Sequence, residues 1–150
     1  MKKLDFRVLL PNVITLTGLS FGLSSIRFAL ESDFNLAIVC ILFAGVCDAL
    51  DGMLARHLKS ESDLGAQLDS LSDFLSFGIA PGLLIYMSIF NQDSRIGAFA
   101  ALAFIIFSCL RLALYNVRLE ESEATDGEPE HFFTGIPTPM GAILIILPLT

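Results

Sequence analysis

The sequence predicts an all-α protein, a polytopic bundle of transmembrane helices. Apolar residues make up 54% of its 150 residues, only 17% are charged, and the mean hydropathy is +0.71. The apolar residues form long uncharged runs, which is typical of membrane proteins. Four aspartates, at positions 48, 51, 69 and 73, lie inside otherwise apolar segments. Because a carboxylate within a membrane is energetically costly, these four mark a functional site.

The uncharged runs divide the chain into helices. A hydrocarbon core of about 30 Å needs roughly 20 helical residues, and the runs predict spans over about 9–30, 34–57, 65–91 and 96–117. A fifth apolar run begins near Thr138 and continues to Thr150. We therefore expect one transmembrane domain, residues 1–150, with a partial fifth span at 138–150 and a C-terminal truncation. The missing helices would complete the bundle wall or a homodimer face.

The first span follows a basic N-terminus that contains Lys2, Lys3 and Arg7. A basic segment before an apolar run also describes a signal peptide, but this run is long, contains Pro11 and Asn12, and lacks a clear small-residue cleavage site. By the positive-inside rule, the three cations place the N-terminus in the cytoplasm.

The connections between spans agree with this orientation. The first one, at 31–33, carries no cation and is expected outside, whereas Arg56, His57 and Lys59 follow the second span and are expected inside. The 91–95 turn is expected outside, and the 119–131 loop inside. This last loop holds six of the sixteen acidic residues, and the net charge is −7. Such a balance argues against nucleic acid as a partner.

The second span carries two aspartates on one face. Three- and four-residue separations place side chains on the same side of a helix, so Asp48, Asp51, Gly52 and Ala55 form a single stripe. Small residues on a membrane helix usually permit close helix packing. Beside two carboxylates, they could equally leave room for a ligand.

The third span repeats this chemistry. Gly65, Asp69 and Asp73 follow one another at four-residue steps, each of which turns only about 40° around a helix. Four carboxylates pointed at one another cannot all stay ionised unless cations lie among them. Oxygen ligands favour hard ions such as Mg²⁺ or Mn²⁺, and two such ions suit the binding of a pyrophosphate.

Two interpretations of these residues remain open at this point. In the first, Arg56 binds a phosphate oxygen at the cytoplasmic end of the stripe, and the metal ions support catalysis. In the second, the aspartates form a pathway for protons or cations, and Arg56 only anchors the helix at the membrane surface.

The complete pattern decides between them. The order Asp48-x-x-Asp51-Gly52-x-x-Ala55-Arg56, eight residues, Gly65-x-x-x-Asp69-x-x-x-Asp73 resembles the signature of the CDP-alcohol phosphatidyltransferase family at every position. The resemblance implies a catalytic bundle of six or more transmembrane helices. It also implies a reaction in which an alcohol attacks the β-phosphorus of a CDP-linked lipid and releases CMP.

The resemblance assigns a role to each residue of the pattern. Two divalent ions, Mg²⁺ or Mn²⁺, would be held by Asp48, Asp51, Asp69 and Asp73, and Asp73 would also act as the general base. The CDP-lipid would be bound by Gly52, Ala55, Arg56 and Gly65. Outside this pattern, Asn12, Thr15 and Thr17 on the first span could bond to the cytidine or merely to neighbouring helix carbonyls.

Two further stretches bear on the acceptor alcohol. The segments 111–118 and 133–139 resemble the phosphatidylserine synthase branch of the family, which implies CDP-diacylglycerol and L-serine as substrates. Arg111 and Arg118, seven residues apart, would meet the serine carboxylate, together with Asn116. Two alternatives are kept: the same chemistry with glycerol 3-phosphate or inositol phosphate as acceptor, or a cation transporter. The enzyme would be an integral, multi-pass membrane protein with its active site on the cytoplasmic side.

Overall fold

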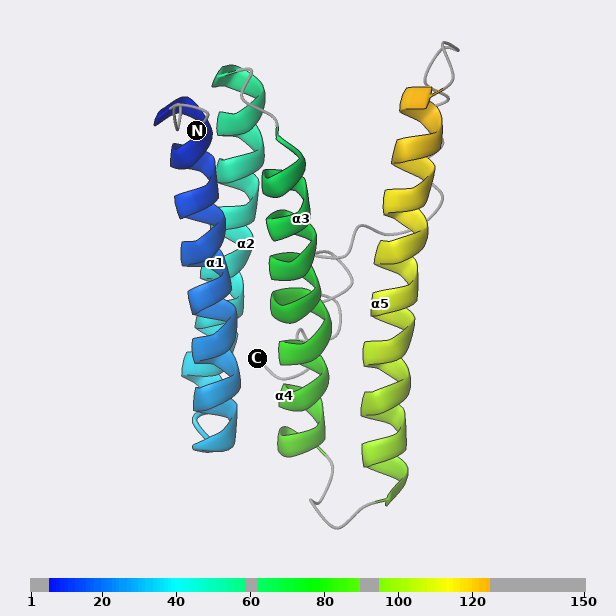
Figure 1. The fold of residues 1–150 in the computed structure, drawn as a ribbon. Helices are drawn as coiled ribbons and strands as arrows, with labels where there is room; N and C mark the ends of the chain where they lie inside the picture. The colour runs from blue at the N-terminus through cyan, green and yellow to red at the C-terminus, as the bar shows by residue number, and fades with distance from the viewer. Residues whose placement is uncertain (1–5, 59–61, 90–94, 125–150) are drawn as a thin grey trace.

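A computed structural model describes residues 6–58, 62–89 and 95–124, and these residues form helices with no strand among them (Figure 1). The elements are α1 (Phe6–Leu30), α2 (Phe34–Leu58), α3 (Asp63–Asp73), the π-helical segment η1 (Phe74–Ile79), α4 (Ala80–Ser88) and α5 (Arg95–Ala124). The predicted all-α fold is confirmed.

Four helical stretches are long and apolar enough to cross a membrane: Leu9–Leu30, Phe34–Leu58, Asp63–Ser88 and Arg95–Arg118. Each corresponds to one predicted span, with ends that differ by at most three residues. The helix of the fourth span continues to Ala124, so the predicted loop begins later than residue 119. The predicted fifth span at 138–150 lies outside the described residues.

Short polar motifs set where α2 and α3 begin. Between α1 and α2, Ser32 adopts a positive φ of 63°, and the side chain of Asp33 accepts a hydrogen bond from the backbone N–H of Leu36. At the start of α3, Ser62 is the N-cap residue and its hydroxyl accepts from the backbone N–H of Gly65 at 3.1 Å. The hydrogen bonds of Asp33 and Ser62 each satisfy a backbone N–H group that has no partner within the first turn of the helix.

The third span is one continuous helix whose middle has π-helical geometry. It runs through α3, η1 and α4, and η1 begins directly after Asp73. Pro81 in the next turn gives a physical reason, because in a regular α-helix its ring would collide with the carbonyl of Phe77. Isolated π segments inside α-helices occur frequently at functional sites.

Helix α1 packs against α2 and against all three parts of the third span, so it lies at the centre of these contacts. Small residues allow the close approach. A Cβ atom on Gly18 would lie 3.1 Å from the Cβ of Cys47, and one on Gly22 would collide with the hydroxyl of Ser76. Glycine is therefore needed where α1 crosses its neighbours.

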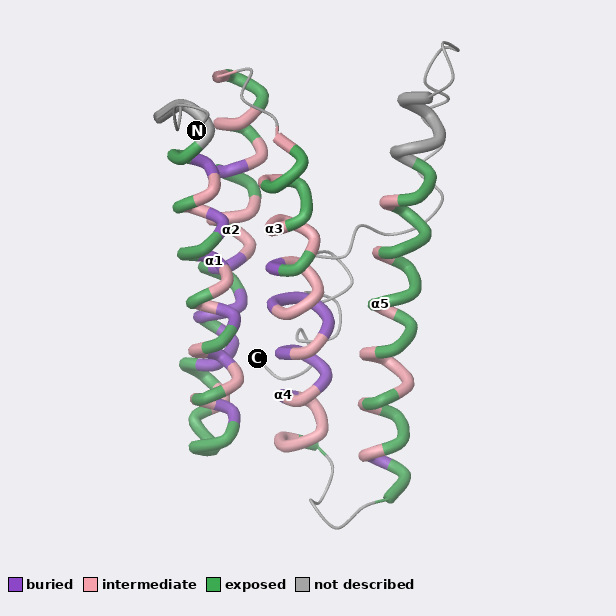
Figure 2. Tube along the Cα trace, viewed as in Figure 1, coloured by how far each residue is buried: buried purple, intermediate pink, exposed green. Residues whose placement is uncertain are grey.

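The apolar core occupies one half of the bundle. Its buried members come from α1, α2, η1 and α4: Ala29, Ala37, Ile38, Ile41, Phe77, Ala80 and Leu84. Figure 2 shows buried residues concentrated in α1, α2 and the third span, whereas α5 is mostly exposed or intermediate. The aspartates lie in the other half, nearer the end where α1 begins.

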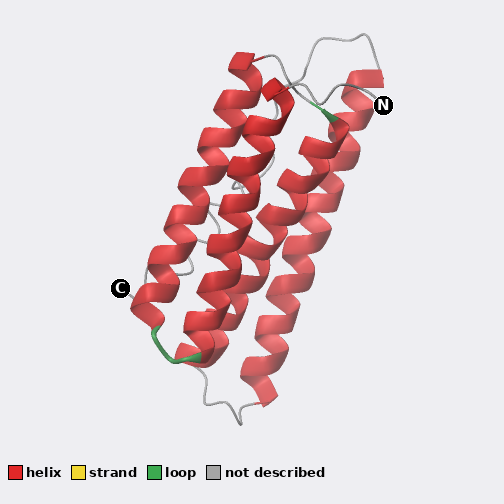
Figure 3. Cartoon of the chain, turned by 60° about the vertical axis from the view of Figure 1, so that its left-hand side comes forward, coloured by secondary structure: helices red, strands yellow, loops and turns green. Residues whose placement is uncertain are grey.

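Helix α5 contacts only the third span among its major partners, through η1 and α4. A Cβ atom on Gly82 would lie 2.9 Å from Cγ1 of Ile105, and one on Gly78 would lie 3.3 Å from the Cβ of Ser108. In Figure 1 the start of α1, the end of α2, the start of α3 and the end of α5 lie at the same end of the bundle, and Figure 3 shows the long helices running alongside one another. Successive spans therefore run in alternating directions, and the assignment of their ends to the inside or the outside stays a prediction.

Candidate metal centre

Two helices bring the predicted aspartates together. Asp48 and Asp51 extend from α2, and Asp69 extends from α3. One carboxylate oxygen from each of these three residues lies within 4.8 Å of the other two. The three- and four-residue spacings in the sequence thus correspond to facing stripes on adjacent helices.

Asp73 joins the same cluster from one turn further along α3. It lies close enough to Asp48, Asp51 and Asp69 to interact electrostatically with all three. All four predicted acids therefore share one site. Asp73, the last of the four, lies at the end of α3, immediately before the π-helical segment η1.

The charges of the cluster are not balanced by protein cations. Among the described residues, no Lys, Arg or His forms an ion pair with any of the four aspartates; the ion pair found there joins Arg27 and Glu31 at the surface. Asp51 is 4% exposed, and its Oδ2 atom is buried without a hydrogen-bond partner. A buried carboxylate oxygen with no partner is costly unless a cation or proton supplies one.

These donors fit a hard divalent ion. Carboxylate oxygens are the ligands that Mg²⁺ and Mn²⁺ prefer, whereas zinc and copper favour nitrogen and sulfur. The nearest cysteine in the sequence, Cys47, does not belong to the group of carboxylates that could hold a metal. The geometry is thus suited to magnesium or manganese.

The residues predicted to bind the nucleotide lie beside this cluster on α2. A Cβ atom on Gly52 would meet no atom within 4 Å, so the space next to it is open. Ala55 is half-buried. The guanidinium of Arg56 is exposed to solvent and donates from Nε to the carbonyl oxygen of Gly52 at 3.1 Å. Among the described glycines, Gly52 has room that the helix packing does not use.

Gly65 on α3 lies in a crowded position. A Cβ atom there would lie 3.0 Å from Oδ1 of Asn12 and 3.1 Å from the hydroxyl of Ser62. The predicted role of Gly65 in lipid binding is neither supported nor contradicted by this contact. The contact does bring the start of α1 next to the start of α3.

The three residues predicted to bind the acceptor alcohol all lie on α5, but their side chains have different surroundings. The side-chain amide of Asn116 donates to the hydroxyl of Ser70 on α3 at 3.0 Å. Ser70 is adjacent in sequence to Asp69, so Asn116 reaches the helix that carries the cluster. Arg111 and Arg118 are exposed. Their proposed contact with an acceptor remains a prediction.

The threonines of α1 lie differently from each other. Thr15 is buried and donates to the carbonyl of Pro11 at 3.1 Å, whereas the exposed Thr17 donates to that of Val13 at 2.8 Å. The backbone carbonyl of Thr15 accepts a hydrogen bond from the hydroxyl of Ser72 on α3 at 3.5 Å. The sequence offered no signal for this contact, or for the one between Ser70 and Asn116, because spacing along one helix does not say which helices become neighbours.

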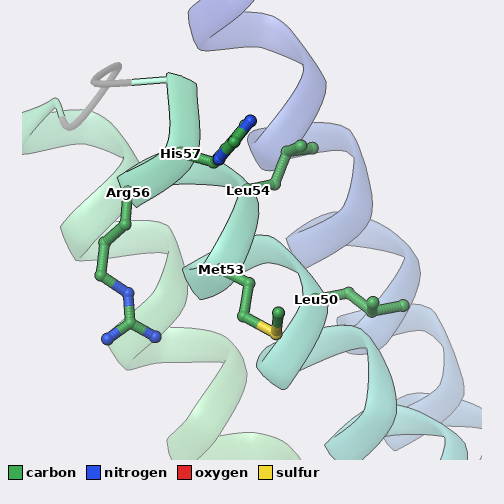
Figure 4. A pocket seen from close by; sticks show the side chains of 5 residues that line it. All are labelled: Leu50, Met53, Leu54, Arg56 and His57. Atoms are coloured by element: carbon green, nitrogen blue, oxygen red, sulfur yellow. The ribbon is translucent and has the colours of Figure 1, made fainter.

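A surface hollow of about 600 Å³ lies elsewhere on α2 (Figure 4). It is lined by Leu50, Met53, Leu54, Arg56 and His57. None of the four aspartates lines it, and Arg56 is the one residue it shares with the predicted site. The hollow is therefore not the candidate metal centre.

Comparison with known proteins adds a family to this geometry. The sequence model described as CDP-alcohol phosphatidyltransferase matches residues 8–150. The chain is also similar to proteins named CDP-diacylglycerol–serine O-phosphatidyltransferase. The one from Mycobacterium leprae is 38% identical over 138 residues, which cover 92% of this chain and 45% of the relative. The one from Helicobacter pylori is 34% identical over 139 residues, or 93% and 56% of the two chains.

The relative from Bacillus subtilis is 34% identical over 142 residues, which cover 94% of this chain and 76% of that protein. The chain spans about half the length of the first curated relatives it matches. No solved structure matches it.

Proposed function

Because the chain belongs to the CDP-alcohol phosphatidyltransferase family, we propose that it transfers a phosphatidyl group from CDP-diacylglycerol to the hydroxyl of L-serine. The products are phosphatidylserine and CMP. The observation that carries this proposal is the gathering of four aspartates from α2 and α3 beside the open space at Gly52. The names of the relatives support serine as the acceptor.

The four aspartates would hold two divalent ions, Mg²⁺ or Mn²⁺. When bound, such ions stabilise negative charge on phosphate oxygens and orient the diphosphate. The unpartnered oxygen of Asp51 and the absence of a paired cation among the described residues support this role. Gly52 and Ala55 leave room for the cytidine, and Arg56 donates to a phosphate oxygen.

The transfer forms one bond and breaks one. The serine hydroxyl oxygen attacks the β-phosphorus, and the bond from that phosphorus to the bridging oxygen breaks, so that CMP leaves with the bridging oxygen. The hydroxyl proton passes to the carboxylate of Asp73, which acts as general base. Asp73 suits this step because it stands at the edge of the cluster, one turn beyond Asp69.

We infer that the acceptor binds on the side of the cluster that faces α5. Asn116 reaches Ser70 and so lies next to the helix that carries Asp69. Arg111 and Arg118 are proposed to provide the positive charge that the serine carboxylate needs. The N-terminus and the site are proposed to lie on the cytoplasmic side, as the distribution of Lys and Arg indicates.

A panel of acceptors tests the proposal. The purified full-length protein is incubated with CDP-diacylglycerol and Mn²⁺, and CMP release is compared for L-serine, glycerol 3-phosphate and inositol phosphate. We expect release with serine and incorporation of labelled serine into lipid. Release with another alcohol alone would replace the acceptor and keep the chemistry. Movement of Mn²⁺ into liposomes without any CMP release would instead indicate a transporter.

A further inference from the structure

The surface hollow on α2 begins beside the open space at Gly52. Arg56 lies about 40° around the helix from Gly52, and Met53 lies about 60° further on. Both Arg56 and Met53 line the hollow, whose volume is about 600 Å³. Figure 4 shows Arg56 on one side of it and Leu50 and Leu54 on the other. The space at Gly52 and the hollow are therefore neighbours on the surface of α2, with Arg56 between them.

The hollow is polar at one end and apolar at the other. Arg56 and His57 lie in the last turn of α2, whereas Met53 and Leu50 lie about one and two turns before Arg56 and are 63% and 50% exposed. The bond to the Gly52 carbonyl uses one of the five N–H donors of the Arg56 guanidinium. Cations next to exposed apolar side chains suit a phospholipid, which joins an anionic phosphate to acyl chains.

Exposed apolar side chains continue from the hollow along the same face of α2. They are between 42% and 54% exposed and comprise Leu50, Val46, Phe43, Val39 and Leu36. At 1.5 Å per residue, positions 36–50 cover about 21 Å of helix, which exceeds half of a hydrocarbon core of about 30 Å. An acyl chain that enters at the hollow can therefore follow this face to the middle of the membrane.

We propose that the hollow receives an acyl chain of CDP-diacylglycerol while the diphosphate of this lipid lies at Gly52 and Arg56. This inference rests on the proposed function and adds to it the place of the lipid tail. The β-phosphate is esterified directly to the diacylglycerol, so the tails leave the site close to that phosphate. Arg56 borders the hollow and bonds to the backbone of Gly52, and it therefore stands where the polar and the apolar parts of the substrate meet.

Bulk lipid over the hollow is the competing explanation. Exposed apolar side chains of a membrane helix face lipid tails in any case, and these tails are as apolar as leucine. Leu114 on α5 is 51% exposed, which is close to the 50% of Leu50. The main partners of α5 are η1 and α4, so Leu114 belongs to a different part of the surface. Leu114 is therefore the matched control for a change of Leu50.

The test fills the hollow with a larger side chain. The variants are Leu50→Trp, Met53→Trp and, as control, Leu114→Trp. CMP release by the purified full-length protein with serine and Mn²⁺ is measured while the mole fraction of dioleoyl CDP-diacylglycerol is varied in detergent micelles. We expect the KM for this lipid to rise about 5-fold or more in the two hollow variants, which corresponds to about 1 kcal/mol, the lower end of the cost of overpacking. The control should keep its KM.

CDP-glycerol separates the tail from the diphosphate, because it carries the diphosphate without acyl chains. Its inhibition constant should be the same in all three variants and in the unmodified protein. Thermal unfolding shows whether each variant is folded, and if Leu50→Trp is not, Met53→Trp at the more exposed position provides the test.

Three results would overturn the place of the tail: an unchanged KM in the folded hollow variants, a similar rise in Leu114→Trp, or an equal rise in the inhibition constant of CDP-glycerol. Each of them leaves the proposed function in place as long as the unmodified protein releases CMP. Failure of the unmodified protein to release CMP overturns the proposed function, and this inference with it.

Discussion

Gly52 differs from the other glycines of the bundle in what surrounds it. A Cβ atom on Gly22 or Gly82 would collide with a neighbouring helix, and one on Gly45 would make ordinary contact with Phe77 at 3.6 Å. A Cβ atom on Gly52 would meet nothing within 4 Å. Helix packing therefore explains why residues 22 and 82 are glycine, but it does not explain why residue 52 is glycine. We propose that a ligand occupies this space.

Substitution of Gly52 with leucine should separate folding from binding. The helix should be as stable or more stable, because glycine is about 1 kcal/mol less favourable than alanine or leucine inside a helix. Binding of CDP-diacylglycerol should weaken by about 1–3 kcal/mol, or about 5- to 150-fold, because the side chain fills the space of the nucleotide. Binding is measured with the labelled lipid, and unfolding by circular dichroism. Gly45→Ala is the control, and normal lipid affinity in Gly52→Leu would refute the proposed pocket.

Replacement of Asp73 with asparagine should remove the proton acceptor while nearly preserving side-chain size. General bases as a class contribute about 10²–10⁴ in rate, so CMP release at saturating Mn²⁺ should fall by about that factor. Asp63→Asn is the control, because Asp63 is exposed in the first turn of the same helix. Equal rates in the two variants would contradict a role for Asp73 as base.

The spacing of residues along each helix predicted that the four aspartates form one site, because helical periodicity is a property of a single segment. The hydrogen bond between Asn116 and Ser70 depends on which helix packs beside α3, and periodicity carries no such information. For the same reason, the predicted common face of Arg111 and Arg118 says nothing about their distance from the cluster. Of these three residues, Asn116 is the one with a hydrogen bond to α3 among those found in the described part of the chain.

The third span shows what the sequence did not predict about an element. Its length and apolar character were predicted, but its division into α3, η1 and α4 was not. A π-helical turn adds one residue to a helix and leaves the hydrophobic pattern on each side intact. The turn follows Asp73 directly, so it sets the rotation of the core-facing residues Phe77, Ala80 and Leu84 relative to the aspartates.

Among the described residues, the hydrogen bond between the side chains of Asn116 and Ser70 joins α5 to α3. An uncharged hydrogen bond contributes about 1 kcal/mol to stability, so Asn116→Ala should lower the unfolding temperature slightly. If this helix also positions the acceptor, the variant should raise the KM for serine more than it changes the affinity for CDP-diacylglycerol. Asn35→Ala is the control, since Asn35 is exposed at the start of α2. An unchanged KM for serine would count against acceptor binding at α5.

At the scale of the whole molecule, the bundle has a polar half and an apolar half. The aspartates of α2 and α3 lie about two to three helical turns from the end of α2 and the start of α3, and the buried apolar cluster fills the other half. The span order and the alternation of connections were predictable from hydropathy and charge. The packing of α1 at the centre was not, because hydropathy treats each span alone. The exposed side of α5 is apolar and suits lipid or further helices.

The four aspartates are proposed to form one divalent-metal centre for phosphatidyl transfer. Its most direct test is CMP release from CDP-diacylglycerol and serine by the purified full-length protein after chelation and after metal is added back. We expect release to fall to background in the chelator, to recover with Mg²⁺ or Mn²⁺, and not to recover in Asp69→Asn. Undiminished release in the chelator, or full recovery in Asp69→Asn, would contradict the claim.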